Sequence, residues 1–353
     1  MKIVTPKVLV RCMTYNHEPY IEDALNGFVM QKTNFPFIVA VIDDASTDNN
    51  MTVIKEFISK NCNRTKNYIE EDKEYGKVIQ SQSTNNPNCH FYVVLLNKNH
   101  YSDPNKRALR HFYYRFIEDQ AKYIAMCEGD DYWTDPYKLQ KQVDFMDTHP
   151  EYVMCCHSVD WYQEGKLIKQ NIICQHDSDL RTEDIISQGG YYINICSVLF
   201  KKELMANRTN YQIIATVGDH PLCIKAALSG KVRFLHETMS VYRCFVKNGW
   251  TDRNYHDDKI KAIHLYNTIC WMQAMNKETN KKYNSSVLQL IGPLYSYTYK
   301  NGGFPNKWTY IKMSFEAGPK NIKRACKDIL IEAFPWLWSI YNSIRVRSNK
   351  MEL

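Results

Sequence analysis

The chain contains no long apolar run, and its N-terminus lacks the pattern of a secretion signal. No stretch approaches the ~20 consecutive apolar residues that a membrane-spanning helix needs. The apolar run within residues 1–13 is short and is interrupted by Pro6 and Arg11, which argues against a signal peptide. From these two absences we expect a cytoplasmic protein.

Paired cysteines are also missing. None of the twelve cysteines belongs to a Cys-x-x-Cys pair, and they are scattered along the chain. Cys12, Cys127 and Cys196 lie within apolar strand-like runs, where cysteine behaves as a small hydrophobic residue. A disulfide framework is typical of short secreted chains. We therefore expect free thiols in a reducing compartment, and the spacing does not support a structural zinc site.

The sequence has no long basic run, no signature of a nucleic-acid-binding fold, no internal repeat and no low-complexity segment. Nucleic acid is therefore not expected as a partner. The remaining composition is globular: of 353 residues, 44% are hydrophobic and 24% are charged, enough for one large or two ordinary domains. The net charge of +7 suits binding of anions such as diphosphates, or an acidic membrane surface, without requiring either.

The first 157 or so residues alternate between strand-like and helix-like patterns. Short buried runs predict strands at Val8–Met13, Phe37–Ile42, Phe91–Leu96, Tyr123–Cys127 and Val153–His157. Helices are predicted at residues 20–30, 53–58 and 105–121, and after the N-cap pair Asp135–Pro136. Residues 61–90 are polar and predict a long loop or an insertion. The alternation predicts a doubly wound, Rossmann-like α/β sheet with helices on both faces.

After residue 158 the pattern is mixed. It predicts a hairpin at residues 162–166, a helix at 182–188, a strand at 193–200, a helix at 219–228, and strands at 232–235 and 239–242. From about residue 257 the chain has helical spacing with many aromatic residues. We therefore divide the chain into an α/β domain, residues 1–250, and a helical C-terminal region, residues 251–353.

Polar residues follow three of the predicted strands. Thr14-Tyr15-Asn16 comes after the first, the run Asp43 to Asp48 after the second, and the run Glu128 to Trp133 after the fourth. Ligands of doubly wound sheets bind beyond the carboxyl ends of the strands, so the three turns are expected to share one crevice. An Asp-Asp-x-Ser sequence after a strand also occurs as a plain turn, and both interpretations stay open for it.

The third turn, Glu128-Gly129-Asp130-Asp131, favours a cation site. It holds three carboxylates in four residues, and like charges packed at a strand end are unfavourable unless a cation or ligand compensates them. Hard divalent cations bind through oxygen, and magnesium typically takes one or two protein carboxylates together with substrate phosphates. We expect such a cation at this turn.

Taken together, these motifs resemble those of the family 2 glycosyltransferases. That family carries, in this order, a Thr/Pro-Thr-Tyr-Asn turn, an Asp-Asp-x-Ser-x-Asp turn and an Asp-x-Asp metal motif. Residues 123–142, YIAMCEGDDYWTDPYKLQKQ, are similar to a bacterial branch with an EGDDYW-type metal motif. The resemblance covers roughly residues 5–245. It implies a GT-A fold and transfer of a sugar from a nucleotide-sugar donor, with Mn2+ or Mg2+ as cofactor.

The same resemblance assigns the halves of the α/β domain. Residues 1–157 would be the nucleotide-binding half and residues 158–250 the acceptor-binding half. Thr14 and Tyr15 would flank the nucleobase. Asp44 would hydrogen-bond the base, with Asn16 and Asp43 in the same donor-binding turns.

The acidic turn would hold the metal. By the resemblance, Asp130 is the metal ligand, Asp131 lies beside it, and Glu128 lies near the ribose or the sugar. The family has Asp where this chain has Glu128, a change that leaves the role of Asp130 unaltered. The metal would bridge the donor diphosphate and stabilise the charge on the leaving nucleoside diphosphate.

The catalytic base is expected in the second half of the domain. Asp219, in the sequence GDHP, resembles the acidic base motif of the family. The residues alone equally allow Asp219 to cap the helix that follows it. His220 is a second candidate for the base, because histidine titrates near neutrality.

Arg243 is expected to contact the diphosphate. It ends the sequence SVYR, which resembles a late Tyr-Arg motif of the family, and its forked charge suits a diphosphate. Many relatives have a histidine two positions later, where this chain has Phe245, so a late histidine ligand is not expected. Lys106, Arg107 and Arg110 either face the diphosphate or form a solvated helix face.

The C-terminal segment, residues 322–346, mixes basic and aromatic side chains. It either packs as a helix on the protein core or lies on an anionic membrane surface, and Pro335 interrupts a continuous amphipathic helix. Peripheral attachment to the inner face of the cell membrane would suit an enzyme that extends a lipid-linked saccharide.

The implied reaction is inverting transfer from a nucleoside-diphosphate sugar, with UDP preferred, to a hydroxyl of a glycan or lipid-linked acceptor in surface polysaccharide synthesis. Two alternatives stay open. A nucleotidyltransferase that activates a sugar phosphate usually has a Gly-rich basic loop after the first strand, which this chain does not have there. A non-catalytic sugar-binding protein would not need both the acidic turn and Asp219.

Overall fold

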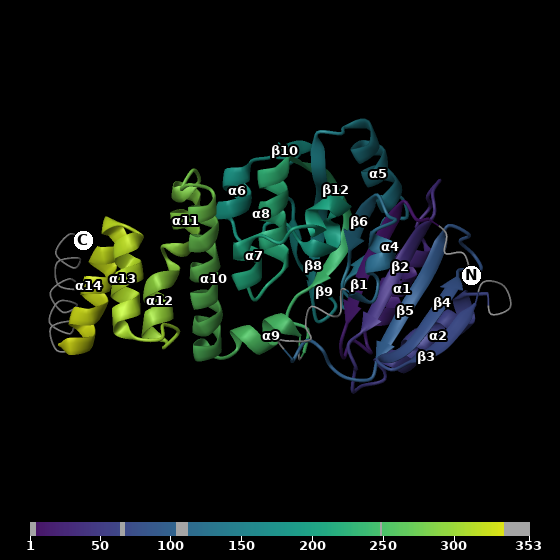
Figure 1. The fold of residues 1–353 in the computed structure, drawn as a ribbon, viewed down its shortest axis with the longest axis horizontal. Helices are drawn as coiled ribbons and strands as arrows, with labels where there is room; N and C mark the ends of the chain where they lie inside the picture. Colours follow the sequence, from purple (N-terminus) through teal and green to yellow (C-terminus); the bar gives the residue numbers. More distant parts are fainter. Residues whose placement is uncertain (1–4, 64–67, 104–111, 248, 335–353) are drawn as a thin grey trace. The chain divides into compact units, whose positions relative to one another are not determined.

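The computed structural model describes residues 5–63, 68–103, 112–247 and 249–334. The chain divides into two compact units. The first comprises Met1–Arg208 and Asp219–Thr251, and the second Thr209–Gly218 and Asp252–Leu353. The first unit contains the sheet, and the second is helical (Figure 1).

The described strands form one twelve-stranded mixed sheet. They are β1 (Val8–Thr14), β2 (Phe37–Asp43), β3 (Ile69–Lys73), β4 (Gly76–Gln82), β5 (Cys89–Leu96), β6 (Tyr123–Met126), β7 (Tyr132–Trp133), β8 (Tyr152–Gln163), β9 (Lys166–Asn171), β10 (Ser178–Leu180), β11 (Leu199–Lys201) and β12 (Lys231–Arg243). Their order is β10-β12-β8-β11-β6-β1-β2-β5-β4-β3, with β7 paired to β12 and β9 to β8. Strands β5, β2, β1 and β6 run parallel, as do β8 and β12.

Helices of the first unit are α1 (Ile21–Val29), α2 (Asn50–Asn61), α4 (Arg115–Glu118), α5 (Lys138–Thr148), α6 (Thr182–Ser187) and α8 (Asp219–Ser229), with 3-10 turns η1 (Ile195–Ser197) and η2 (Lys202–Met205). The division between the units falls within α9 (Trp250–Tyr255). The second unit holds α7 (Asn210–Ile214), α10 (Asp258–Glu278), α11 (Asn284–Ile291), α12 (Leu294–Lys300), α13 (Lys307–Glu316) and α14 (Pro319–Ala333).

The central strands are buried on both faces, which explains their continuous apolar runs. On β1, Val8 and Val10 point into a core shared with α1, α2 and α5. Leu9, between them, points into a second core with Tyr114 and Ile117 near α4. Alternate strand residues face opposite sides of a sheet, so a strand covered on both sides needs apolar residues at every position. The doubly wound arrangement predicted from the sequence is confirmed.

Two of the predicted elements are wrong. Residues 61–90, expected as a long loop or an insertion, are not a long loop: they include the antiparallel hairpin β3–β4, which extends the sheet beyond β5. Strand β3 is polar and mostly exposed at the edge, so its stability comes from backbone pairing rather than from apolar burial. Residues 193–200, expected as one strand, form η1 followed by the short β11.

Two predicted boundaries also shift. The two strands expected at residues 232–242 are one strand, β12, with register shifts against β8 near Leu235 and Thr238. Helix α5 begins at Lys138 rather than directly after Asp135. There Asp135 Oδ1 accepts a hydrogen bond from the Tyr137 amide at 2.7 Å, so Asp135 shapes the turn before the helix.

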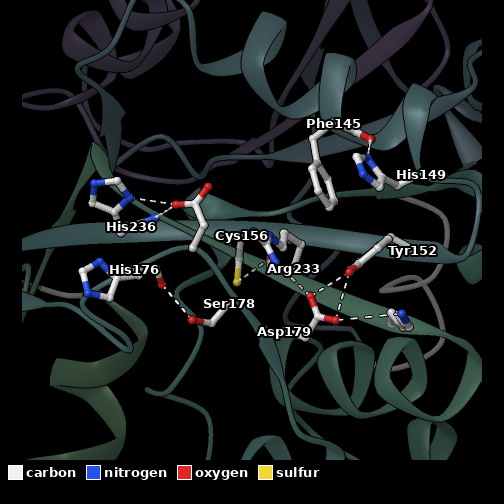
Figure 2. Close-up of polar contacts among 11 residues, drawn as sticks. Phe145, His149, Tyr152, Cys156, His176, Ser178, Asp179, Arg233 and His236 are labelled. Atoms are coloured by element: carbon white, nitrogen blue, oxygen red, sulfur yellow. Dashed lines mark hydrogen bonds and ion pairs between the residues drawn. The ribbon is translucent and has the colours of Figure 1, made fainter.

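A polar network joins the beginnings of β8 and β12 to β10. Figure 2 shows Asp179 between Tyr152, whose hydroxyl donates to it at 2.7 Å, and Arg233, whose guanidinium lies 3.1 Å away. Burial alone would raise the pKa of Asp179, but these hydrogen bonds lower it. His236 is paired with Asp177 at 2.7 Å. The network fixes this edge of the sheet at the end opposite to Arg243.

The second unit is a packed group of helices. Tyr299 stacks on Tyr310 with ring centroids 4.2 Å apart, and the Tyr310 hydroxyl donates to the buried Asp328 at 2.7 Å. Lys300 pairs with Asp328 at 3.1 Å. Among the helices that the structure describes, none combines the length and apolarity needed to cross a membrane. All twelve cysteines are free thiols, as expected.

A buried lysine organises the segment behind the acidic turn. Lys138 is fully buried, its amine lies 4.1 Å from the centre of the Trp133 ring, and it donates to Gln142 Oε1 at 2.8 Å. Trp133 and Gln142 in turn donate to the carbonyls of Cys196 and Ser197 at 3.0 and 2.8 Å. These contacts hold η1 against α5, and burial lowers the pKa of Lys138 to about 8.

We expect Lys138→Met to raise the free energy of unfolding at pH 7 by about 1–2 kcal/mol, because it removes a buried ammonium that has no carboxylate partner in the described contacts. The folded-state pKa of Lys138 lies below its unfolded value, so between about pH 8 and 10.5 this residue binds more protons in the unfolded state and contributes a rise in stability with pH. The buried cysteines act in the opposite direction but are common to both proteins, so the expected result is a rise in wild-type stability relative to the variant, measured by urea unfolding at several pH values.

Lys141→Met is the matched control. It lies on the same helix, and its amine pairs with Asp135 at 2.7 Å and with Glu237 near the surface. Its variant should keep the wild-type rise. An unchanged rise in Lys138→Met would show that the Lys138 amine is charged in the folded protein at these pH values.

Candidate functional site

The three polar turns lie side by side at the carboxyl ends of adjacent strands. Strand β1 is parallel to both β2 and β6, and Thr14 at its end is in register with Asp43 at the end of β2. Two backbone hydrogen bonds join the turns, from Asp44 N to Thr14 O at 3.0 Å and from Gly129 N to Met13 O at 2.9 Å. The topology therefore brings the turns to one edge, as the strand pattern predicted.

Asp43 is completely buried and shapes the second turn from inside. Its carboxylate accepts from the Ser46 amide at 2.8 Å, from the Ser46 hydroxyl at 2.7 Å and from Asn50 Nδ2 at 2.5 Å. Burial raises the pKa of Asp43 despite these hydrogen bonds. Asn50 also donates to Thr14 Oγ1 at 3.1 Å, so Asp43 and Asn50 together connect the first two turns.

Asp44 fixes a neighbouring loop. It is also buried, and its two carboxylate oxygens accept from the amides of His100 and Tyr101 at 2.8 and 2.9 Å. The side chain of Asn99 donates to the Asp44 carbonyl at 2.9 Å. The segment after β5 is thereby held beside the second turn, a contact between residues 55 to 57 positions apart that the sequence pattern did not indicate.

The first turn is held by its asparagine. Asn16 has a φ of +58°, a left-handed conformation that asparagine tolerates better than most residues. Its amide donates to Ser46 Oγ at 2.9 Å, and its Oδ1 accepts from the Thr47 amide at 2.7 Å. Thr14 is buried, whereas Tyr15 is half-buried and borders the edge.

The acidic turn presents its three carboxylates differently. Glu128 is exposed, the side chain of Asp130 is 18% exposed, and Asp131 is buried. Burial, followed by the charge of Asp130, raises the pKa of Asp131 well above its usual range. Gly129 is required by space, because a Cβ there would lie 2.6 Å from Thr14 Oγ1. The turn is therefore pressed against the first turn.

Arg243 clamps the acidic turn from the end of β12. Its amide donates to Asp131 Oδ1 at 2.9 Å, its Nη1 donates to the Asp130 carbonyl at 2.8 Å, and its Nη2 pairs with Asp23 at 2.5 Å. The guanidinium also lies over the ring of Tyr132 at 4.5 Å. In the described contacts Arg243 thus positions the turn.

His17 belongs to this site, and the sequence analysis did not select it. Its Nε2 lies 3.7 Å from Asp130 Oδ2, and its Nδ1 is buried without a hydrogen-bond partner. It directly follows the first turn, so its position next to a recognised motif was the only available signal. Its proximity to Asp130 arises from the pairing of β1 with β6.

Asp219 is the first residue of α8 and is partly exposed. Burial of its carboxylate raises the pKa of Asp219 to about 6, and its charge contributes to the raised pKa of Cys223, one turn further along the helix. His220 is buried and donates from Nε2 to the Ile185 carbonyl at 2.8 Å. Burial lowers the pKa of His220 to about 4, which favours a structural role for this histidine.

The acidic turn fits a cation that takes few protein ligands. In the part of the chain that the structure describes, no group of three or more His, Cys, Asp and Glu side chains is placed to bind a metal. Mg2+ commonly binds one or two carboxylates and completes its shell with phosphates and water. Asp130 meets that requirement because it is an accessible carboxylate directly beside a buried one, and the charge repulsion within the turn favours a cation.

Two groups of predicted residues lie outside the described residues. Lys106, Arg107 and Arg110 are one group, and the C-terminal segment from residue 335 onward is the other.

Comparison with known proteins identifies sequence relatives of this chain and solved structures with a similar fold. No family model matches the chain. Uncharacterized proteins of Mycobacterium tuberculosis and Mycobacterium bovis are 30% identical to it over 246 residues, which cover 68% of this chain. The match spans 61% of the length of those relatives.

Among solved structures, the chain is similar to S. aureus TarS 1–349. In complex with UDP-GlcNAc, that protein is 13% identical, with a TM-score of 0.51, and the match covers 93% of this chain and 91% of the other. The complex with UDP gives 15% identity, a TM-score of 0.50 and the same coverage. The fold of this chain is accordingly the mixed α/β fold of GT-A type, followed by C-terminal helices.

Proposed function

We propose that the protein is an inverting glycosyltransferase that uses a nucleoside-diphosphate sugar and a divalent cation. The observation that carries the proposal is the meeting of the Thr14 turn, Asp44 and Asp130 at the carboxyl edge of β1, β2 and β6. Open α/β sheets bind ligands at this edge. The similarity to S. aureus TarS in complex with UDP-GlcNAc supports a sugar nucleotide as the ligand and uridine as its base.

The donor nucleotide would lie against the first two turns. Tyr15 offers a half-buried ring beside the buried Thr14. Asp44 would accept a hydrogen bond from an N–H of the base, in addition to the backbone amides that its two oxygens accept. Asn16 and Asp43 would act by holding the shape of these turns.

The diphosphate would lie at the acidic turn. A Mn2+ or Mg2+ ion bound by Asp130 would supply positive charge to the leaving diphosphate. Arg243 would keep Asp130 and Asp131 in place, because its backbone amide and guanidinium are already bonded to that turn. Exposed Glu128 would contact the ribose or the sugar.

Asp219 would act as the general base. Its carboxylate takes the proton of an acceptor hydroxyl while the oxygen forms a bond to the anomeric carbon. The bond from that carbon to the diphosphate breaks at the same time, and its electron pair leaves with the nucleoside diphosphate, so the configuration inverts. With a pKa of about 6, Asp219 is ionised at pH 7 yet more basic than an ordinary carboxylate.

The acceptor would be a glycan or a lipid-linked saccharide in surface polysaccharide synthesis. A lipid-linked acceptor would place the enzyme at the inner face of the cell membrane. The basic and aromatic residues 322–346 would then lie on the lipid surface.

We expect Asp219→Asn to reduce turnover by about 10²–10⁴-fold, since a positioned base contributes that much. In the wild type, kcat/KM should fall about tenfold per pH unit below about pH 6, as Asp219 becomes protonated. The measurement is nucleoside-diphosphate release with an acceptor panel. Asp179→Asn removes the same charge in the network of Figure 2 and should keep wild-type turnover. Equal rates in the two variants would exclude Asp219 as the base.

We expect UDP with Mn2+ to raise the melting temperature, and Asp130→Ala to abolish that rise. A ligand at about 100 times its Kd stabilises the folded state by about 2.7 kcal/mol, or about 4–5 °C for a protein of this size. The screen compares UDP, GDP, dTDP and CMP, each with Mn2+ or EDTA, by thermal shift. Asp72→Ala, an exposed position on β3, is the matched control. A full Mn2+-dependent shift in Asp130→Ala would rule out this carboxylate as the metal ligand.

A further inference from the structure

Three aromatic rings gather at the carboxyl ends of β8 and β12. Trp161 on β8 is in register with Tyr242 on β12, and their ring centroids are 5.4 Å apart. Tyr191, from the loop before η1, places its ring 5.5 Å from Trp161 and remains 42% exposed. The three rings, termed the aromatic platform here, all belong to the first unit.

The polar atoms of the platform side chains contact neighbouring polar residues, which fixes the orientation of the rings. Trp161 Nε1 donates to Asn194 Oδ1 at 2.9 Å, and Asn171 Nδ2 donates to the same oxygen at 2.8 Å. The side chain of Thr251 lies near the hydroxyls of both Tyr191 and Tyr242 and lowers their pKa values, against the larger effect of burial, which raises them. Because the polar ends are engaged, the ring faces are what the platform offers to a ligand, and they are ordered before it binds.

The platform adjoins both the acidic turn and the start of α8. Tyr242 directly precedes Arg243, whose amide donates to Asp131 Oδ1 at 2.9 Å. Gly190, which directly precedes Tyr191, packs against His220, and a Cβ at Gly190 would lie 3.7 Å from that of His220, the neighbour of Asp219. A group resting on the rings would thus lie near the acidic turn and near the first residues of α8.

The chemistry of the platform suits an uncharged sugar ring. One face of a pyranose presents C–H groups with partial positive charge, and these stack on the electron-rich face of an aromatic ring. Lys169 is exposed, and its amine lies over one face of the Trp161 ring, 5.0 Å from the ring centre, where it can donate a hydrogen bond to a sugar hydroxyl beside the rings. Ligand pockets commonly combine aromatic walls with a few such polar groups.

We infer that Trp161, Tyr191 and Tyr242 form the binding site for a pyranose ring of the acceptor, which they present to Asp219. The inference rests on the proposed function. The donor sugar is tied to the diphosphate at Asp130, whereas the acceptor hydroxyl must reach the base. Asn171 and Asn194 are positioning residues, because they act on the ligand only through Trp161 and the Tyr191 loop.

The test titrates the full chain with methyl glycosides of glucose, N-acetylglucosamine, galactose and mannose, with and without UDP and Mn2+, by saturation-transfer NMR. We expect at least one glycoside to bind the wild type, and Tyr191→Ala and Trp161→Ala to weaken it at least tenfold. Tyr191→Phe, which keeps the ring, should bind within about threefold of wild type. Trp308→Ala, an aromatic truncation at a 78% exposed position in the second unit, is the matched control.

The UDP–Mn2+ thermal shift separates this inference from the proposed function. Tyr191→Ala should keep the full shift, which shows that the variant is folded and its donor site intact. Equal glycoside affinity in wild type and Tyr191→Ala, or no glycoside binding to the wild type, overturns the platform whatever the shift. Absence of the shift in the wild type overturns the proposed donor site, while ring-dependent glycoside binding would still support the platform.

Discussion

The contact of Arg243 with Asp130 and Asp131 connects the two halves of the first unit at the point where negative charge is concentrated. Two adjacent carboxylates at the end of β6 repel each other, and burial of Asp131 increases the cost of its charge. Arg243 reaches both residues with its backbone amide and its guanidinium, and its own position follows from the pairing of β12 with β8 and β7. The acidic turn therefore depends on the sheet being complete.

The segment behind this turn is also held by contacts between distant parts of the chain, but only one of its contacting side chains is charged. Trp133 and Gln142 donate to the backbone of η1, and Lys138 is buried against both of them. The segment around Cys196 is thereby held next to Asp131. Burial raises the pKa of Cys196, and the negative charge of Asp131 is the second cause of this rise. Neighbouring residues of this segment thus have different roles. Asp130 is partly exposed to solvent, while the buried side chains of Trp133 and Lys138 hold η1 against α5 behind it.

The strand predictions were correct for strands whose two faces are both buried. They failed for β3, which only backbone pairing stabilises, and for residues 193–200. Strands such as β1 and β2 carry apolar residues at every position because helices cover both faces, so their runs are recognisable. Strand β3 has almost no buried side chain, and only its backbone pairing with β4 makes it a strand. In the same way, the apolar residues 193–200 gave no sign that η1 would interrupt them, because buried irregular segments are as apolar as buried strands.

The sequence by itself determined the order of strands and turns, the concentration of carboxylates in residues 128–131 and the resemblance to a glycosyltransferase, because these depend on local pattern and residue type. Only the tertiary structure decided what each side chain faces. It buried Asp43 and Asp44 with their oxygens bonded to the protein, brought His17 to Asp130 and assembled three rings from residues 161, 191 and 242. The contacts of Asp44 with His100, of His17 with Asp130 and among the three rings join residues 30 to 113 positions apart, so they depend on strand pairing, such as that of β1 with β6 and of β8 with β12, and not on local sequence.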